Sequence, residues 1–422
     1  MNAASIAGAA PELQAGEPRR PNVMERAHTS LTRAHAQIAQ LSGQFPFGFV
    51  LEHPSTRSGG QIINFGSSNY LGLSTAPEVV AAALAATRTF GTSTTGPRLF
   101  NGTLKLHLQL EEELADFYGK QAAAILQSGF AANVALLSSL LTPKDTVIFD
   151  RDSHASQREG AARARIPSTA FRHNDPASLG RRIASLHPGT AFLVAVDGVF
   201  SMDGSVSPLR EITSLTRSNG GTLLVDEAHG VGVLGETGRG AAERHGCLDD
   251  VDLITVSLSK ALAGTGGAVI GSRAVVEEIS FTSRSYIFTA SCDPAAAAAA
   301  LTSLRLLRRT PELPAIARRN GQLLRMVIMD AGWQALPGET PLACLPVRNR
   351  ISAITAWRSL LESGIYANVA MPPAVPEHGC VIRLAATASH SGHDFERLHS
   401  ALVTARGRLR ESRKLHHGGA HA

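Results

Sequence analysis

The sequence predicts an α/β fold, in which a large domain with a mainly parallel sheet is followed by a small α+β C-terminal domain. Short apolar segments bounded by turn residues alternate with segments of helical periodicity along most of the chain. This alternation is typical of parallel strands joined by crossover helices. The chain has 422 residues, which is long enough for one large and one small domain.

Six short apolar segments are predicted to be buried strands. They are residues 122–127, 146–149, 192–196, 222–225, 253–257 and 268–270. The helices between them are predicted at residues 104–118, 132–141, 178–186 and 209–219. Ligands of such sheets bind beyond the carboxyl ends of the strands. Asp197, Asp226 and Lys260 each fall at or just after a predicted strand end, so we expect them to converge on one crevice.

The segments outside the large domain differ from it in composition. Residues 1–22 are rich in Ala, Gly and Pro, which predicts a mobile tail. Residues 23–63 are predicted to hold an opening helix, near 24–41, and a connecting segment. The large domain is predicted at 64–309, and residues 412–422 are predicted to be a second mobile tail.

The sequence Arg309-Thr310-Pro311 is predicted to mark the change to the small domain, residues 310–411. Helices and strands both occur in this region. The helices are expected near 315–330 and 353–363 and from about 394, and the strands near 344–347 and 381–385. This mixed pattern predicts an α+β domain.

Composition argues against several classes of protein. The net charge is only +5 and the basic residues are scattered, which argues against nucleic-acid binding. No apolar segment approaches the roughly 20 residues needed to span a bilayer, and no signal-peptide pattern is present. The four cysteines are far apart without metal-ligand spacing, which fits free thiols in a reducing cytosol. We therefore expect a cytoplasmic protein without a bound metal.

The most informative residues follow two of the predicted strands. Asp226 ends an apolar strand, His229 lies at the Gly-rich turn after it, and Lys260 comes about thirty residues later. A buried carboxylate is costly unless it is paired with a cation, and a protonated pyridine nitrogen is such a cation. A lysine with small neighbours can become a desolvated nucleophile that forms a Schiff base. Asp226 could also cap a turn or bind a metal, and His229 could be structural, but together the residues predict a pyridoxal-phosphate (PLP) enzyme.

Two further turns offer contacts to a flat, phosphorylated cofactor. His154 follows a predicted strand, and its ring could stack on the cofactor. The turn Ser128-Gly129-Phe130 opens a helix, where backbone N–H groups can hold a phosphate. Each could also be an ordinary structural turn. The segment 230–235 matches G-x-G-x-x-G, but the polar residues before it and the loop after it argue against dinucleotide binding.

Taken together, these residues resemble the α-oxoamine synthase family of fold-type I PLP enzymes. The resemblance runs from about residue 64 to residue 390, and its motifs occur in the order that the family has. They are Asn69-Tyr70-Leu71-Gly72-Leu73, residues 90–117 and 128–133, Ser153-His154-Ala155-Ser156, Gly198-Val199-Phe200-Ser201-Met202-Asp203-Gly204, residues 226–230 and 257–260, Phe288-Thr289-Ala290-Ser291 and Arg383.

The resemblance implies a role for each matching residue around the cofactor ring. Lys260 is implied to form the Schiff base with PLP and to remove the α-proton of the amino acid. Asp226 is implied to pair with the pyridine nitrogen, and His154 to stack on the ring. His229, assisted by Ser201, is implied to act at the cofactor phenolic oxygen or at the incoming acyl carbonyl.

The resemblance also implies how the phosphate and the substrate are held. The phosphate contacts would come from the turn Ser128-Gly129-Phe130, from Ser257, and from Thr289 across a dimer interface. Asn69 and Arg383 would bind the amino-acid carboxylate, with the Arg383 guanidinium as a two-pronged donor. The implied protein is a homodimer with shared active sites.

The implied reaction joins glycine, alanine or serine to an acyl thioester and releases carbon dioxide, which gives an α-amino ketone. The thioester would be carried on CoA or on an acyl carrier protein. The segment 91–103 is more similar to serine palmitoyltransferase and to secondary-metabolite members than to 8-amino-7-oxononanoate synthase, which remains the alternative.

Two other functions were weighed against this one. An aminotransferase of the same fold would also use Asp226 and Lys260, but the set His154, Asp203 and His229 argues against it. A regulatory subunit would typically lack the Schiff-base lysine, which this chain retains. Two positions depart from the family pattern: Asp197 stands where Glu is frequent, and Ser259 where several relatives have Gly. We expect the shorter Asp197 to change its contacts, and Ser259 to narrow the pocket or add a hydrogen bond.

Overall fold

The computed structural model describes residues 62–371, 375 and 379–418, with side chains up to residue 411. The predicted tail 1–22, the opening helix near 24–41 and most of the connecting segment lie outside the described residues. So do the side chains of the histidines at 416, 417 and 421. The predicted domain boundaries stay predictions.

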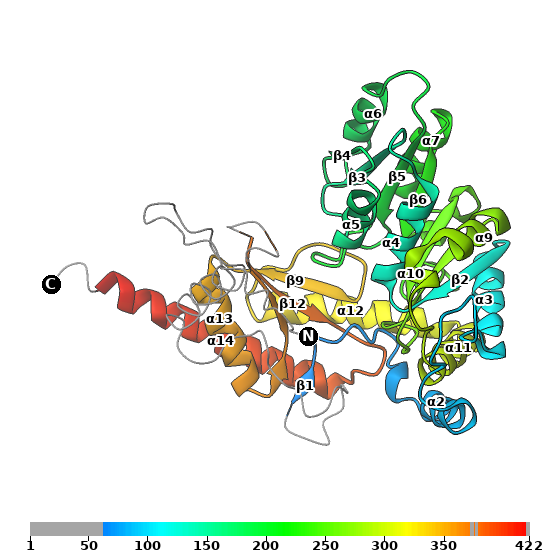
Figure 1. The fold of residues 1–422 in the computed structure, drawn as a ribbon. Coiled ribbons are helices and arrows are strands. Elements are labelled where there is room, and N and C mark those ends of the chain that lie inside the picture. Colours follow the sequence, from blue (N-terminus) through cyan, green and yellow to red (C-terminus); the bar gives the residue numbers. More distant parts are fainter. Residues whose placement is uncertain (1–61, 372–374, 376–378, 419–422) are drawn as a thin grey trace, which may run out of the picture. The chain divides into compact units, whose positions relative to one another are not determined.

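The large domain is built on a seven-stranded sheet with the order β2-β8-β7-β6-β5-β3-β4 (Figure 1). The strands are β2 (Ala122–Leu126), β3 (Thr146–Asp150), β4 (Ser168–Phe171), β5 (Phe192–Asp197), β6 (Thr222–Asp226), β7 (Leu253–Ser257) and β8 (Gly267–Gly271). Only β8 runs against its neighbours; the other strands are parallel to one another. The predicted α/β fold and all six predicted strands are confirmed.

Both faces of this sheet are covered by helices, because alternate residues of each strand point to opposite faces. Val194 of β5 and Val225 of β6 face a core shared with helices α2 (Pro77–Phe90), α3 (Lys105–Tyr118), α6 (Pro176–Ala184), α7 (Leu209–Ser218) and α11 (Pro294–Arg309). Leu193 and Leu224 face the opposite core. Its helices are α4 (Gly129–Leu140), α5 (Ala155–Arg163), α9 (Arg273–Thr282) and α10 (Arg284–Ile287). The strands are therefore buried on both sides, which explains their continuous apolar sequences.

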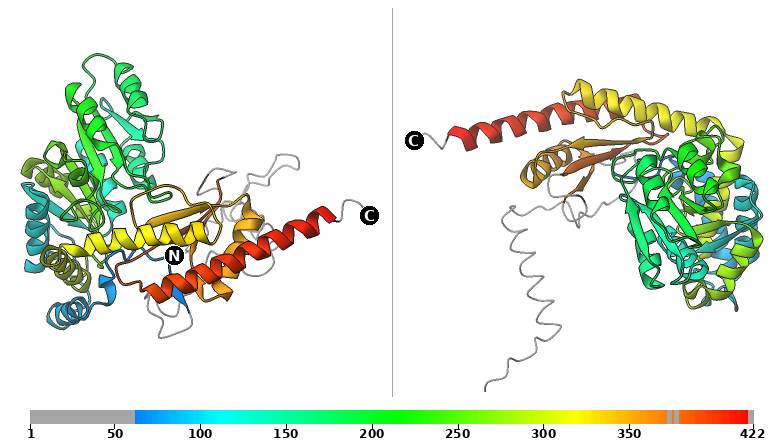
Figure 2. Two further views of the ribbon diagram at one scale, coloured as in Figure 1. Left: turned by 180° about the vertical axis from the view of Figure 1, so that it is seen from behind. Right: turned by 90° about the horizontal axis from the view of Figure 1, so that it is seen from above.

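The small domain combines a three-stranded antiparallel sheet, in the order β11-β12-β9, with three helices. Its elements are α12 (Glu312–Asp330), β9 (Leu342–Pro346), α13 (Arg350–Glu362), β11 (Asn368–Ala370), β12 (Val381–Ala385) and α14 (Gly392–Gly418). Helices α12 and α14 pack against each other, as the yellow and red helices of Figure 2 show. A two-stranded parallel pair joins β1 (Ile63–Asn64) to β10 (Ile365–Tyr366). The mixed α+β character of this region is confirmed.

The remaining short elements are η1 (Leu73–Thr75), α8 (Ala241–Arg244) and η2 (Leu248–Asp250). Within the described residues, no helix has both the length and the apolar character that a membrane crossing requires. Over the same residues, no three His, Cys, Asp or Glu side chains gather where they could hold a metal ion. All four cysteines are buried and free.

Candidate active site

A cavity of about 160 Å³ lies where strands β5, β6 and β7 end and helix α4 begins. The side chains and backbone that line it come from residues far apart in the sequence. They are Ser128, Gly129, Phe130, Asn133, His154, Asp197, Val199, Asp226, Ala228, His229, Ser257, Ser259 and Lys260. The structure thus brings together most of the site residues that the sequence predicts, at the carboxyl ends of the strands.

Asp226 is held in one orientation by two donors. The Asn133 side-chain amide donates to Asp226 Oδ2 at 2.6 Å, and the Ala228 backbone N–H donates to Oδ1 at 2.9 Å. Asn133 is fixed in turn by Ser156 and by the Thr255 hydroxyl, which donates to Asn133 Oδ1 at 2.8 Å. Asn133 is therefore a site residue whose role sequence reasoning missed, although it lies within the motif 128–133.

Lys260 is partly buried at the same cavity. Desolvation by burial lowers the pKa of its amine, while the attraction of Asp226 opposes this shift and Arg383 adds to it. A lowered pKa increases the fraction of the neutral amine, which is the nucleophilic form. The side chain can therefore act as a nucleophile and as a base.

His229 is buried beside Tyr70. The Tyr70 hydroxyl and His229 Nδ1 are 2.6 Å apart, and their rings meet edge to face. Desolvation, followed by the positive charge of Lys260, places the pKa of His229 well below its usual range. Burial also raises the pKa of the Tyr70 phenol. The phenol therefore keeps its proton and can donate it to Nδ1, which leaves the imidazole proton on Nε2.

His154 lies at the exposed mouth of the cavity, before helix α5. Its Nδ1 is 2.7 Å from the Ser156 hydroxyl, and the Phe130 ring meets it edge to face. The backbone N–H of His154 donates to Asp197 Oδ1 at 3.2 Å, and Gln157 donates to the same oxygen at 2.8 Å. Asp197 thus lines the cavity and anchors the turn that carries His154.

Asp197 and Asp226 end neighbouring parallel strands and are paired in register. Burial raises the pKa of Asp197 well above its usual range, and the negative charge of Asp226 adds to the shift. Because like charges repel, two carboxylates on paired residues of neighbouring strands disfavour the state in which both are ionised. Asp226, with two donors on it, is the better placed of the two to face a cation.

An anion-binding cradle closes the end of the cavity next to helix α4. Ser128 caps the helix, with its hydroxyl accepting from the Ala131 N–H at 3.0 Å. A Cβ on Gly129 would lie 3.1 Å from the Ser257 Cβ, so a larger residue would push Ser257 away by a few tenths of an ångström. The Ser257 and Ser259 hydroxyls are 2.8 Å apart. N–H groups at a helix N-terminus together with hydroxyls are the donors that a phosphate requires.

Four of the predicted site residues do not line this cavity. Asn69 hydrogen-bonds with Ser74, its amide donating at 2.8 Å. Arg383 Nε donates to the Ser201 carbonyl oxygen at 2.7 Å, and the Arg383 charge acts on Tyr70. Thr289 adjoins Ala290, which forms an isolated β-bridge with Pro97. The roles implied for these four residues stay predictions, as do those implied for the residues that line the cavity.

The donor set of the cavity fits PLP. Lys260 offers an amine for the aldehyde, Asp226 a carboxylate for a pyridinium nitrogen, and the start of α4 with Ser257 a set of donors for the phosphate. His154 at the mouth offers a flat ring of suitable size for stacking.

Comparison with known proteins agrees with this chemistry. The family model "Aminotransferase class I and II" matches residues 60–402. Serine palmitoyltransferase of Caulobacter vibrioides is 39% identical over 375 residues, which are 87% of this chain and 93% of the relative. 8-Amino-7-oxononanoate synthase of Geobacter sulfurreducens is 40% identical over 348 residues, 82% of this chain and 89% of the relative.

Solved structures give the same result. A serine palmitoyltransferase of Sphingomonas wittichii matches with a TM-score of 0.88 and 32% identity, covering 92% of this chain and 99% of that one. A serine palmitoyltransferase structure with PLP bound matches with the same TM-score and 31% identity. The chain therefore belongs to the α-oxoamine synthase family, on the fold of class I and II aminotransferases, and is a PLP-dependent acyltransferase.

Proposed function

We propose that this enzyme condenses serine with a long-chain acyl thioester and releases carbon dioxide, as a serine palmitoyltransferase-like enzyme. The observation that carries the reaction class is the single cavity that Lys260, Asp226 and two histidines, His154 and His229, line together. Serine is preferred over glycine and alanine because serine palmitoyltransferases match this chain over most of its length in both sequence and structure.

Bound PLP supplies an electron sink for the pair of electrons left when the amino-acid α-proton is removed. Lys260 would hold the cofactor and, when its Nζ is free and neutral, would take that proton. Asp226, kept in place by Asn133 and Ala228, would face the pyridine nitrogen. His154 would cover the ring at the mouth of the cavity, and the start of α4 with Ser257 would hold the phosphate.

The second half of the reaction needs a donor for the carbonyl oxygen of the acyl thioester. We assign it to the neutral imidazole of His229, whose proton is kept on Nε2 by the Tyr70 hydroxyl. Ser201 assists on the same side. Arg383 and Asn69 bind the amino-acid carboxylate, with Arg383 as the charged partner. The acyl chain arrives on CoA or on an acyl carrier protein.

The enzyme is proposed to work as a homodimer in the cytoplasm. Phe100 and Phe288 are 76% and 77% exposed, and the β-bridge between Pro97 and Ala290 joins their two segments. Gln127, just before the cradle, donates to the Ala290 carbonyl, so this apolar surface adjoins the cavity. Exposed apolar surface of this kind marks an interface, and a second copy would carry Thr289 to the neighbouring phosphate. The four free, buried cysteines support the cytoplasmic location.

The 40% identity to 8-amino-7-oxononanoate synthase supports one alternative, in which the same machinery uses the amino acid and thioester of that enzyme. Membership of the α-oxoamine synthase family disfavours the aminotransferase alternative. The two synthases differ only in substrate, so the deciding experiment is a substrate panel.

The test measures thiol and carbon dioxide release by the purified holoenzyme with glycine, alanine or serine and acyl-CoA of graded chain length. We expect equal release of both products with serine and a long chain, and none with Lys260→Ala, which should also lose the cofactor's Schiff-base absorption. Preference for alanine would support the alternative synthase. Turnover by Lys260→Ala at the wild-type rate would contradict the reaction class itself.

A further inference from the structure

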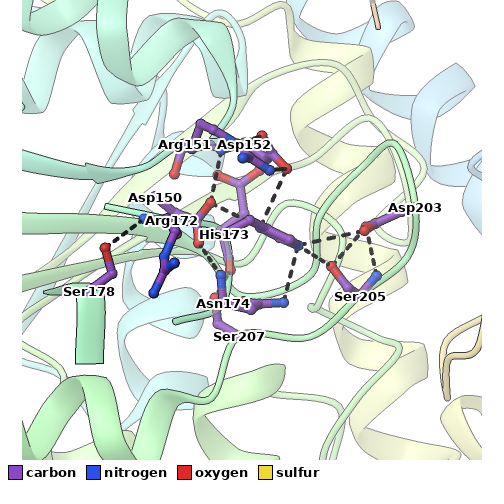
Figure 3. A network of polar contacts seen from close by, with 12 residues as sticks. Asp150, Arg151, Asp152, Arg172, His173, Asn174, Ser178, Asp203, Ser205 and Ser207 are labelled. Carbon is purple, nitrogen blue, oxygen red and sulfur yellow. Dashed lines mark hydrogen bonds and ion pairs between the residues drawn. The ribbon is translucent and has the colours of Figure 1, made fainter. Parts of the chain in front are cut away.

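A second cluster of ionisable side chains lies outside the cavity, around His173 at the turn after β4 (Figure 3). His173 Nδ1 is 2.9 Å from Asp150 Oδ1, at the end of β3. His173 Nε2 is 3.0 Å from the Ser205 hydroxyl and 3.6 Å from Asp203 Oδ2. One imidazole therefore joins the carboxyl end of the sheet to the segment that carries Asp203.

The charges in this cluster favour an imidazolium. Burial disfavours a positive charge on His173. The attraction of the Asp150 and Asp203 carboxylates outweighs this effect of burial and raises the pKa of His173 to about 10. Asp152 also faces Nδ1, at 3.8 Å. His173 in turn helps to lower the pKa of Asp203 against the effect of burial. At neutral pH the cluster is an Asp–His⁺–Asp bridge.

This bridge holds one end of a short loop, residues 199–207. Within the loop, the Phe200 N–H donates to the Ser205 carbonyl at 2.9 Å and the Gly204 N–H to the Phe200 carbonyl at 3.0 Å. The Ser205 N–H and hydroxyl both donate to Asp203 Oδ1. The Phe200 ring packs edge to face on His173, with centroids 4.4 Å apart. The loop is thus a tight turn clamped at Asp203 and Phe200.

The other side of the 199–207 loop contacts the small domain. The Ser201 carbonyl accepts from Arg383 Nε at 2.7 Å, the Met202 carbonyl from the Cys344 thiol at 2.9 Å, and the Gly204 carbonyl from the Thr340 hydroxyl at 3.2 Å. A Cβ on Gly204 would lie 2.9 Å from the Thr340 hydroxyl oxygen, so the two chains are in close contact. Three of the loop carbonyls therefore accept hydrogen bonds from β12, β9 and the segment before β9.

We propose that His173 is a positioning residue for the amino-acid substrate: it fixes the 199–207 loop, whose Ser201 carbonyl orients the Arg383 guanidinium. A guanidinium held through Nε is limited in the directions in which its terminal nitrogens can point, which is what recognition of a carboxylate requires. This inference rests on the proposed role of Arg383. It predicts that damage at His173 weakens amino-acid binding and leaves the thioester side of the reaction unchanged.

The test compares wild type with His173→Gln and with Asp203→Asn, which cuts the bridge only on the loop side. Hydrogen–deuterium exchange should rise at the amides of residues 200, 204 and 205. In the holoenzyme, KM for the amino acid should rise roughly tenfold, while kcat and the KM for the thioester change less than about twofold. His399→Gln removes another His–Asp pair, with Asp330 at 3.0 Å, and serves as the matched control with no effect on either readout.

The outcomes separate this inference from the proposed function. If hydrogen–deuterium exchange of the loop amides is unchanged in both variants, His173 does not fix the 199–207 loop. Faster exchange with an unchanged amino-acid KM contradicts the link from the loop to Arg383. A wild-type holoenzyme that binds no amino acid contradicts the proposed function, and loop exchange then still decides whether His173 fixes the loop.

Discussion

The surroundings of a candidate catalytic side chain, and not its residue type alone, determine which hydrogen bonds it makes and how its pKa shifts. Asp226 accepts two hydrogen bonds and remains an acceptor, whereas Asp197, buried next to it, has its pKa raised well above the usual range. The same residue type thus lies in two different environments at the ends of neighbouring strands. Such differences follow from three-dimensional neighbours, so the sequence could indicate both residues but not their different surroundings.

The two departures from the family pattern have local explanations. Asp197 still reaches the cavity and accepts from the His154 backbone and from Gln157. Ser259 adds a hydroxyl that meets Ser257 at 2.8 Å, which is the extra hydrogen bond expected from the sequence. Asn133 and Tyr70 lay within recognised motifs, but their function arises from partners about 90 and 160 residues away, which no local pattern reveals.

Removing the Tyr70 hydroxyl should lower both the catalytic activity and the stability of the enzyme. Tyr70→Phe keeps the ring but leaves buried His229 Nδ1 without its hydrogen-bond partner, which should cost about 1–3 kcal/mol of stability. If the transition state loses a similar amount of stabilisation, kcat/KM should fall roughly 5- to 150-fold. Steady-state kinetics and thermal melts measure the two effects. Tyr118→Phe is the matched control, because the buried Tyr118 hydroxyl has no hydrogen-bond partner among the described residues. Equal activity of both variants would show that Tyr70 does not support His229.

At the scale of elements, the strands with continuous buried apolar sequences were predictable, and the very short or partly exposed strands were not. All six predicted strands have two buried faces and therefore a continuous apolar sequence. Strand β4, at the edge of the sheet, was missed because Ser168 is exposed and its next two residues are only partly buried. Strands β10 and β11 were missed because they have only two and three residues.

The cradle depends on close packing between three elements, the start of α4, the end of β7 and the start of β8. A Cβ on Gly267 would lie 2.5 Å from the Ser128 carbonyl carbon and from the Gly129 nitrogen, both backbone atoms. Gly267→Ala should therefore displace the start of α4, cost about 1–3 kcal/mol of stability, and weaken PLP binding.

Absorbance titration of the apoenzyme with PLP, together with thermal melts, measures this effect. Gly180→Ala in α6 is the control, because the nearest atom to its new Cβ is 3.9 Å away. That variant should gain about 0.5–1 kcal/mol from its helical position and bind PLP normally. Normal PLP affinity in Gly267→Ala would mean that the backbone of α4 does not contribute to the phosphate site.

For the whole molecule, the sequence predicted a site at the carboxyl ends of the strands, with Asn69 and Arg383 added from outside the sheet, and the structure adds how these distant segments are connected. Tyr70 precedes the sheet and forms a hydrogen bond with His229. Arg383 lies in β12, and its positive charge helps to lower the pKa of His229. The 199–207 loop connects the large sheet to β9, to β12 and to the segment before β9 through three carbonyl contacts. One loop therefore joins the strand that ends at Asp197 to the strand that carries Arg383, a relation that no single motif contains.

The apolar surface around Phe100 and Phe288 leads to a prediction about assembly. A second copy that covers it would remove two highly exposed aromatic rings from water and bring Thr289 to the neighbouring cavity. Wild type should sediment at about twice the 44.4 kDa chain mass. Phe288→Asp should weaken the dimer by roughly 30-fold or more, since a central aromatic contributes at least about 2 kcal/mol, and should lower PLP affinity in parallel. Ile351→Asp, which removes a 59% exposed apolar side chain from the small domain, should change neither dimer affinity nor PLP affinity. A wild-type monomer with full PLP affinity would contradict the shared site, because Thr289 would then have no neighbouring phosphate to reach.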